Sequence, residues 1–337
     1  MTQPTVDLSA GPVILNISGL HKTFPVMQSL VDRLRGEAVR EVKALNGVSL
    51  DVRRGETLGI VGESGCGKTT LARCIVRLYD ANDGSIHFDS LDVLALEGAA
   101  LRAYHRRVQM VFQDPFNSLN PRMTVGQTLG EAIRVHRLRP PGQVDDRIHE
   151  LLDLVGLPPD AVDRLPHEFS GGQRQRIGIA RCLAVEPEIL VADELVSALD
   201  VSVQAQIINL LLDLQERLHL TVLFVAHDLR LVRHISHRVA VMYLGSVVEI
   251  AETERVFSQP LHPYTQALIS AAPTLDPTSK STVEAVRGEL PSPLNLPKGC
   301  PFHTRCPQAF DRCRVEIPRL KASTAEQHLV ACHLYDT

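Results

Sequence analysis

Eight consecutive residues have the types and spacing of a phosphate-binding loop. They follow the pattern G-x-x-x-x-G-K-[ST] and read Gly62-Glu63-Ser64-Gly65-Cys66-Gly67-Lys68-Thr69. Glycines let successive backbone N–H groups point at one anion, the lysine reaches the β- and γ-phosphates, and the threonine hydroxyl suits Mg²⁺. An apolar, strand-like stretch precedes the loop, and a segment with helical periodicity begins at Thr70. This order of strand, loop and helix predicts a nucleotide site formed by residues 62–70.

Further candidate catalytic residues follow other predicted strands. Asp193 and Glu194 come directly after a buried apolar strand, where Asp193 is suited to hold Mg²⁺ and Glu194 to act as general base on the attacking water. Gln113 ends another short strand and is a candidate contact to Mg²⁺ or to that water. His227 follows a third strand and is expected at the same sheet edge, close to the γ-phosphate.

The segment Ser170-Gly171-Gly172-Gln173 has two interpretations. A serine hydroxyl and two glycines at the start of a helix can bind an anion, so the segment can be a second phosphate seat. Alternatively, Ser170 is an ordinary helix N-cap. If the two phosphate seats do not serve one nucleotide within the chain, the second seat belongs to a nucleotide held by another subunit.

Taken together, these motifs resemble the ATP-binding subunit of an ABC transporter. Six motifs of that family occur in the expected order over residues 13–250. In this comparison Gly62–Thr69 corresponds to Walker A, Gln113 to the Q-loop, Phe169–Gln173 to the LSGGQ signature, Ile189–Glu194 to Walker B, Ser197–Asp200 with its Asp200 to the D-loop, and His227 to the switch histidine. Phe24 lies where the family has an adenine-stacking aromatic residue, although a phenylalanine before a proline also suits simple packing.

A narrower resemblance to the oligopeptide and dipeptide importers covers nearly the whole chain. It rests on the insert between Phe24 and Ala44 and on residues 197–206, 262–265 and 299–307. Leu195 departs from the family, where many relatives have proline or alanine, and we expect altered packing with hydrolysis retained.

This resemblance implies a set of partners. Two ATPase subunits, identical or homologous, pack head to tail with ATP between them, and two membrane permease subunits and an extracytoplasmic substrate-binding protein complete the transporter. The chain is then peripheral to the cytoplasmic face of the plasma (inner) membrane. The alternatives are the same ATPase role for nickel, glutathione or a sugar, a soluble ABC ATPase not coupled to transport, and a regulatory nucleotide-binding module without turnover.

Bulk composition is compatible with this interpretation. The 337 residues are 44% hydrophobic and 22% charged, which is ordinary for a globular protein of about two domains. A formal net charge of −4 provides no basic field for a nucleic-acid backbone, so no nucleic-acid partner is expected. No apolar run approaches the roughly 18 residues of a membrane span, and the N-terminus does not resemble a signal peptide.

The elements that position these residues predict an α/β fold. Strands at residues 13–17 and 48–52 predict an antiparallel layer, and the alternating strands and helices after the phosphate loop predict a mainly parallel P-loop core. Helical periodicity punctuated by prolines predicts a helical subdomain over about residues 115–185, and residues 239–250 predict a hairpin. We expect a nucleotide-binding domain over residues 1–265 and a linker with a small cysteine-rich extension over residues 266–337.

Four of the seven cysteines lie in the last forty residues. They are Cys300, Cys306, Cys313 and Cys332. In a reducing compartment such a cluster suggests metal ligands before disulfides. The spacing is wider than in most structural zinc sites, so a [4Fe–4S] cluster is favoured over zinc, with unliganded or disulfide-linked cysteines as further alternatives.

Overall fold

The computed structural model describes residues 11–26, 40–112, 119–197, 199–271, 289–323 and 327–336. The chain divides into two units that are each assembled from segments far apart in the sequence. Unit 1 is built mainly from residues 53–57 and 95–226. Unit 2 is built from residues 13–52, 58–94 and 227–337.

Three parallel strands form the centre of unit 1. They are β6 (Val108–Val111), β7 (Ile189–Asp193) and β8 (Thr221–Val225), in the order β8-β7-β6. Every residue of β7 and β8 is buried, as expected of strands that are covered on both faces. Asp193 lies in register with Val225, so the carboxyl ends of β7 and β8 are level with each other.

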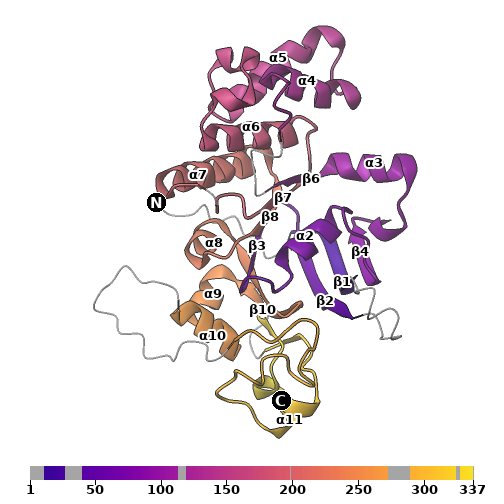
Figure 1. Ribbon diagram of the computed structural model, residues 1–337, viewed down its shortest axis with the longest axis vertical. Helices are drawn as coiled ribbons and strands as arrows, with labels where there is room; N and C mark the ends of the chain where they lie inside the picture. Colours follow the sequence, from indigo (N-terminus) through magenta and orange to yellow (C-terminus); the bar gives the residue numbers. More distant parts are fainter. Residues whose placement is uncertain are drawn as a thin grey trace, which may run out of the picture. The chain divides into compact units, whose positions relative to one another are not determined.

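The helices of unit 1 include the predicted helical insertion. Among them, α4 and α5 pack on each other and on α6 (Figure 1). Short 3₁₀ turns at residues 141–143, 159–163 and 166–168 each begin with a proline, which is favourable at the first helical position. The α-helices are α3 (Gly98–Arg107), α4 (Val125–Val135), α5 (Val144–Leu154), α6 (Gly171–Leu183) and α7 (Val201–Leu218).

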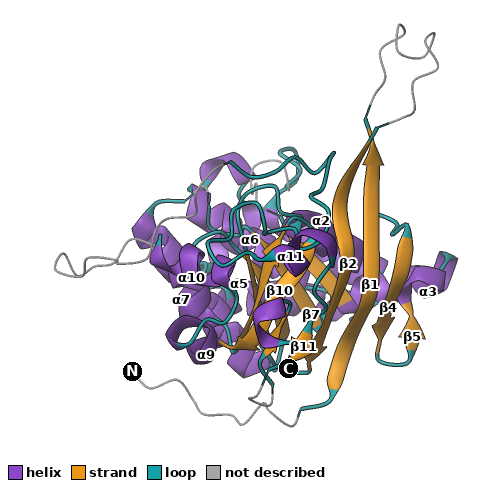
Figure 2. Cartoon of the chain, turned by 90° about the horizontal axis from the view of Figure 1, so that it is seen from below, coloured by secondary structure: helices purple, strands orange, loops and turns teal. Residues whose placement is uncertain are grey.

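Unit 2 contains the antiparallel layer. Its strands are β1 (Val13–Pro25), β2 (Glu41–Arg53), β4 (Asp83–Phe88) and β5 (Leu91–Asp92), in the order β2-β1-β4-β5 (Figure 2). β1 and β4 pair antiparallel, and Leu15 and Ile17 of β1 are fully buried. β1 and β2 are longer than the sequence predicts, because the apolar pattern covers only residues 13–17 at the start of β1 and residues 48–52 near the end of β2.

A second group of strands in unit 2 carries the phosphate loop and the C-terminal tail. Its strands are β3 (Thr57–Val61), β9 (Arg238–Tyr243), β10 (Ser246–Glu252), β12 (Leu329–Val330) and β11 (Lys321–Ala322). β3 and β9 are parallel, whereas β9 and β10 form the predicted hairpin. β10 also pairs with β12, which joins the cysteine-bearing tail to the same sheet.

Short helices complete unit 2. They are α2 (Lys68–Ile75), α8 (Leu229–Ile235), α9 (Thr253–Ser258), α10 (Pro263–Ser270) and α11 (Asp311–Val315), with 3₁₀ turns at Val93–Ala95 and His333–Tyr335. Within the predicted linker and extension over residues 266–337, residues 272–288 lie outside the described residues, and residues 289–298 carry no helix or strand. The Lys43 N–H donates to the Pro293 carbonyl there at 3.1 Å. The domain boundary after residue 265 stays a prediction.

Candidate functional site

The phosphate loop depends on glycine at two tightly packed positions. Gly62 and Gly67 have φ angles of 154° and 104°. A Cβ atom on Gly62 would lie 2.2 Å from the Met242 carbonyl oxygen, and one on Gly67 would lie 2.4 Å from that of Ala44. Both contacts are with backbone that cannot move aside. These glycines therefore let the loop curl directly against β9 and β2.

Lys68 lies at the start of α2 with its ammonium group folded into the loop. Its Nζ donates to the Gly62 carbonyl at 2.8 Å and to the Glu63 carbonyl at 3.0 Å, and the residue is only 4% exposed. These two acceptors hold the ammonium group inside the loop. Thr69 and Thr70 continue the first turn of α2.

Cys66, within the loop, carries a thiol rather than a thiolate. Burial raises the pKa of Cys66, and the neighbouring Lys68 ammonium only partly opposes this effect. The Cys66 carbonyl accepts a hydrogen bond from the Gly245 N–H at 2.8 Å, which joins the loop to the β9–β10 turn. The β9–β10 turn thus supports one side of the loop, while Ser64 and Gly65 at its tip are exposed.

Phe24, the candidate adenine-stacking residue, is the second-last residue of β1. Its ring meets Tyr79 edge to face, with ring centroids 5.2 Å apart. The ammonium group of Lys22 lies 5.0 Å from the Phe24 centroid. Phe24 is half-buried. These contacts are compatible with both interpretations of Phe24, stacking or packing.

The paired acids of unit 1 lie at the end of β7. Asp193 is 3% exposed, and the next residue, Glu194, is half-buried. Glu194 has a φ of 47°, a left-handed conformation that is uncommon outside glycine. Its N–H donates to the Val225 carbonyl at 2.9 Å, and its carbonyl accepts from the Ser197 hydroxyl at 3.0 Å. A strained backbone held by neighbours on both sides is typical of functional positions.

The segment Ser170–Gln173 forms a capped helix start. The Ser170 hydroxyl accepts from the Gln173 N–H at 3.3 Å, and the Gln173 side-chain oxygen accepts from the Ser170 N–H at 3.0 Å. The structural interpretation of this serine is therefore correct, and it does not exclude an anion at the same helix end. Gly172 packs against α7, since a Cβ there would lie 2.4 Å from Val203.

The remaining predicted residues are spread over both units. His227 is exposed and precedes Asp228, which caps α8. Asp200 is the exposed residue before α7, and Gln113 lies outside the described residues. Leu195 is 2% exposed, so the residue that departs from the family pattern is a packing residue.

Sequence reasoning missed two residues that touch the phosphate loop. The Tyr264 hydroxyl accepts a hydrogen bond from the Glu63 N–H at 2.9 Å, and Arg305 forms an ion pair with the Glu63 carboxylate at 2.9 Å. Both lie more than two hundred positions after Glu63, and no local pattern in the sequence connects them with it.

All four C-terminal cysteines line one small cavity of about 10 Å³. Burial raises the pKa of Cys300 and of Cys332 to about 11 and also raises that of Cys306, so these thiols are protonated near neutral pH. His333 is already engaged, with Nδ1 on Asp336 and Nε2 on the Glu316 carbonyl. Within the described parts of the chain, no three metal-binding side chains are close enough together to hold one ion.

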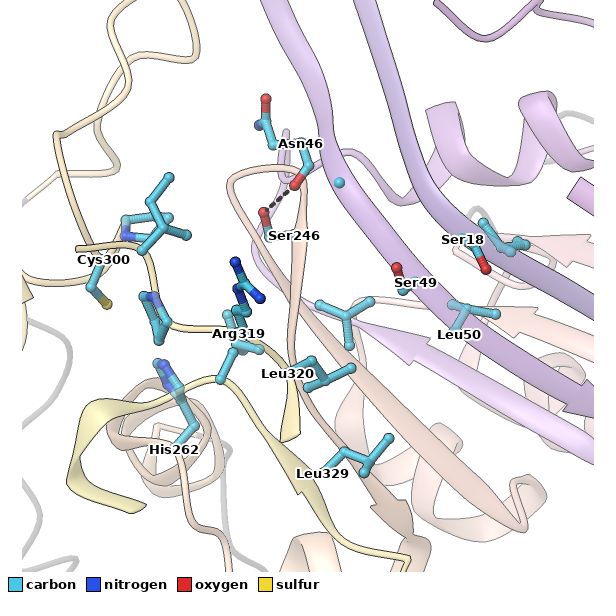
Figure 3. Close-up of a pocket in the computed structure, with 18 of the residues that line it drawn as sticks. Ser18, Asn46, Ser49, Leu50, Ser246, His262, Cys300, Arg319, Leu320 and Leu329 are labelled. Carbon is cyan, nitrogen blue, oxygen red and sulfur yellow. Dashed lines mark hydrogen bonds between the residues drawn. The ribbon is translucent and has the colours of Figure 1, made fainter. Parts of the chain in front are cut away.

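A larger cavity of about 600 Å³ lies elsewhere in unit 2 (Figure 3). Ser18, Ser49 and Leu50 of the antiparallel layer line one side, and Cys300 and Arg319 of the tail line another. No phosphate-loop residue lines this cavity. It is therefore a feature separate from the nucleotide site.

A glycine-dependent phosphate loop between a buried strand and a helix, in an α/β fold, defines a P-loop nucleotide-binding protein. Residues 45–197 match the family described as "ABC transporter", and residues 248–313 match "Oligopeptide/dipeptide transporter, C-terminal region".

Full-length relatives and solved structures agree with these matches. The chain is 50% identical to the oligopeptide transport ATP-binding protein AppF of Bacillus subtilis, over 96% of this chain and 97% of AppF. It is 48% identical to the probable peptide ABC transporter ATP-binding protein y4tS of Sinorhizobium fredii, over 95% and 90% of the two chains. The ATP-binding cassette MJ0796, solved as a dimer in a post-hydrolysis state with ADP and Pi, is 28% identical, with a TM-score of 0.61 over 71% of this chain and 98% of that one. The chain belongs to the ATP-binding proteins of ABC transporters, in the oligopeptide/dipeptide transporter group, and is an ABC-type ATPase.

Among the helices of the described residues, none is both long and apolar enough to cross a bilayer.

Proposed function

We propose that this chain is the ATP-hydrolysing subunit that energises the import of dipeptides and oligopeptides through an ABC transporter. The observation that carries the proposal is the pairing, in one chain, of a glycine-dependent phosphate loop with a C-terminal region of the oligopeptide/dipeptide transporter type. The names of its relatives, which refer to oligopeptide and peptide transport, support the same cargo.

The phosphate loop binds ATP in this proposal. Backbone N–H groups of residues 62–70 and the Lys68 ammonium contact the β- and γ-phosphates, and Phe24 stacks on the adenine. Oxygens of Thr69, Gln113 and Asp193 are the ligands for Mg²⁺, a cation that prefers hydroxyl, amide and carboxylate oxygens. When bound there, Mg²⁺ would neutralise charge on the phosphates.

Glu194 and His227 have separate roles in hydrolysis. Glu194 takes a proton from the attacking water, whose oxygen forms a bond to the γ-phosphorus while the bond to the β–γ bridging oxygen breaks. His227 holds the γ-phosphate and Glu194 in line. The left-handed backbone of Glu194 and its hydrogen bond to Val225 support a fixed position for this base.

A second ATPase subunit, identical or homologous, supplies the other half of each site. Ser170, Gly171, Gly172 and Gln173 face the ATP that is bound to the partner's phosphate loop, and Asp200 belongs to the D-loop at the same interface. The capped start of α6 supports this role, because its N–H groups and helix dipole favour an anion.

The assembly contains two membrane permease subunits and an extracytoplasmic substrate-binding protein. The chain itself is peripheral, at the cytoplasmic face of the membrane. Cargo is selected by the other subunits, so a nickel, glutathione or sugar importer would use much the same ATPase. The ligand bound by the companion binding protein decides between these cargoes: a peptide supports the proposal, and any other ligand overturns it.

The hydrolytic role is tested by Glu194→Gln in the assembled transporter. Loss of the general base is expected to lower the rate of phosphate release by at least about a hundredfold, while ATP binding is retained and the ATP-bound closed pair accumulates. Phosphate release and nucleotide retention after gel filtration measure the two effects. Turnover close to that of the unmodified transporter would remove Glu194 from this role.

We further propose that Cys300, Cys306, Cys313 and Cys332 hold a [4Fe–4S] cluster that folds the C-terminal tail. Four thiols on one cavity support this donor set, and binding requires them to converge and to lose their protons. Zinc is the alternative metal for the same four cysteines. Iron and sulfide analysis with visible absorption of anaerobically purified protein distinguishes them: colourless protein with stoichiometric zinc favours zinc, and protein without metal overturns both.

A further inference from the structure

The C-terminal cysteine segment contacts the phosphate loop through one arginine. Arg305 donates two parallel hydrogen bonds to the Glu63 carboxylate, from Nη1 to Oε2 at 2.9 Å and from Nη2 to Oε1 at 3.1 Å. The side chains are 7% and 26% exposed, respectively. Two-point pairing of this kind fixes the direction of both groups, and partial burial reduces screening by solvent.

The position of Arg305 is determined by the fold of the cysteine segment. Arg305 directly precedes Cys306, and its N–H donates to the Phe302 carbonyl at 3.0 Å. At the start of the same segment, the Cys300 N–H donates to the Cys313 carbonyl at 2.8 Å. The buried Phe302 ring packs edge to face on Tyr243, with centroids 5.2 Å apart. A change in this segment therefore moves Arg305.

Glu63 is held at its backbone as well as at its carboxylate. The hydroxyl of Tyr264, on α10, accepts from the Glu63 N–H at 2.9 Å, and the Tyr243 hydroxyl lies 3.4 Å from Nη1 of Arg305. Tyr243 and Tyr264 are both fully buried, with ring centroids 4.7 Å apart. A rigid aromatic cluster thus lies between the loop and the cysteine segment.

The negative charge of Glu63 makes its ion pair with Arg305 relevant to nucleotide binding. A carboxylate inside a loop that must accept a triphosphate repels the ligand unless it is neutralised. The Glu63 carbonyl also accepts from Lys68, so the orientation of Glu63 affects the lysine that reaches the phosphates. Arg305 supplies the neutralising charge and restrains Glu63 at the same time.

We propose that Arg305 is a positioning residue of the nucleotide site, through which the C-terminal cysteine segment sets the affinity of the phosphate loop for ATP. The arginine acts through Glu63 and does not touch the phosphates. Any change that displaces residues 300–306, such as loss of a bound metal or oxidation of the thiols, then weakens nucleotide binding at a distance. This inference rests on the proposed ATP site at residues 62–70 and does not depend on the transported cargo.

A double-mutant cycle on the full-length chain tests the proposal. The dissociation constant for a fluorescent ATP analogue with Mg²⁺ is measured for the unmodified protein, Arg305→Gln, Glu63→Gln and the double variant. Arg305→Gln is expected to weaken binding by about tenfold, because it leaves the Glu63 carboxylate uncompensated. In the Glu63→Gln background the same substitution is expected to change the affinity by less than about threefold.

Two further variants separate this effect from misfolding. Arg305→Lys keeps the charge and is expected to recover part of the affinity, although lysine lacks the two-point geometry. Arg312→Gln is the matched control, because Arg312 belongs to the same tail and pairs with Glu316 and Asp336. Its nucleotide affinity is expected to stay unchanged.

The outcomes distinguish this proposal from the proposed function. Equal weakening by Arg305→Gln in both Glu63 backgrounds, or no weakening at all, overturns the positioning role. Failure of the unmodified protein to bind the nucleotide overturns the proposed ATP site instead. Weakening of the same size in Arg312→Gln that persists in the Glu63→Gln background would show an effect of the tail that bypasses the Arg305–Glu63 pair, and would also overturn the proposal.

Discussion

His262 is a fully buried histidine that holds a neutral ring. It lies at the N-terminus of α10, where its Nδ1 atom accepts a hydrogen bond from the Tyr264 N–H at 3.0 Å. Burial lowers the pKa of His262 to about 4, and the nearby Glu249 carboxylate offsets this only in part. The neutral ring packs on Phe302 and so belongs to the aromatic cluster beside the phosphate loop. A charge on the ring would disfavour this buried position.

This residue makes stability depend on pH in the acidic range. Because the folded-state pKa lies below the ordinary value of about 6.5, the unfolded chain binds the proton first, and stability falls as the pH decreases from about 6.5 to about 4. The loss is at most about 3 kcal/mol. Urea unfolding at pH 7 and pH 5 measures it. His262→Asn keeps a side-chain acceptor at the N-cap and removes the titration, so the variant is expected to lose less stability than the unmodified protein; an equal loss would contradict the assignment.

At the scale of elements, the start of α6 combines a structural and a functional role, and two substitutions separate them. Ser170→Ala removes the cap and is expected to cost about 1 kcal/mol of stability. Ser170→Asp keeps a good capping residue but places a negative charge at the proposed seat for the partner's ATP. Unfolding and ATPase assays are expected to show near-normal stability with at least about tenfold slower hydrolysis for Ser170→Asp. Unchanged hydrolysis would leave Ser170 as a cap alone.

The close packing of α6 on α7 leads to a second prediction, which concerns stability. Gly172→Ala puts a methyl group 2.4 Å from Cγ1 of Val203, so we expect a loss of about 1–3 kcal/mol of stability. Val203→Ala in the same chain removes the obstructing atom and is expected to recover part of the loss. Urea unfolding of the two single variants and the double variant measures this coupling. Strictly additive losses would mean that the two residues do not compete for the same space.

Elements with a strong local pattern were predictable from the sequence. The glycine loop, the buried strand before Asp193 and the hairpin β9–β10 appear as expected, because periodicity and glycine spacing are local signals. The lengths of β1 and β2 were underestimated, since their polar ends are paired by neighbours that local sequence does not specify. The contacts of Tyr264 and Arg305 with Glu63 could not be predicted, because they join positions more than two hundred residues apart.

At the scale of the whole molecule, the chain carries two proposed phosphate-binding segments. The phosphate loop belongs to unit 2, and Ser170–Gln173 belongs to unit 1. If one ATP needs one seat from each of two chains, a single chain binds nucleotide better than it hydrolyses it. The specific ATPase activity then rises with protein concentration, or on addition of a companion ATPase subunit, because the complete site forms only on association.

Mixing two inactive variants tests this division of the site. A Lys68→Ala chain lacks a working phosphate loop, and a Ser170→Asp chain lacks a working second seat. In a mixed pair, the intact loop of one chain meets the intact seat of the other, so one of the two sites is complete. Random pairing of equal amounts is expected to restore about a quarter of the unmodified activity, as measured by phosphate release. No recovery in the mixture, but recovery when the companion subunit is added to either variant alone, would identify a homologous rather than an identical partner. No recovery in either experiment would contradict the shared site.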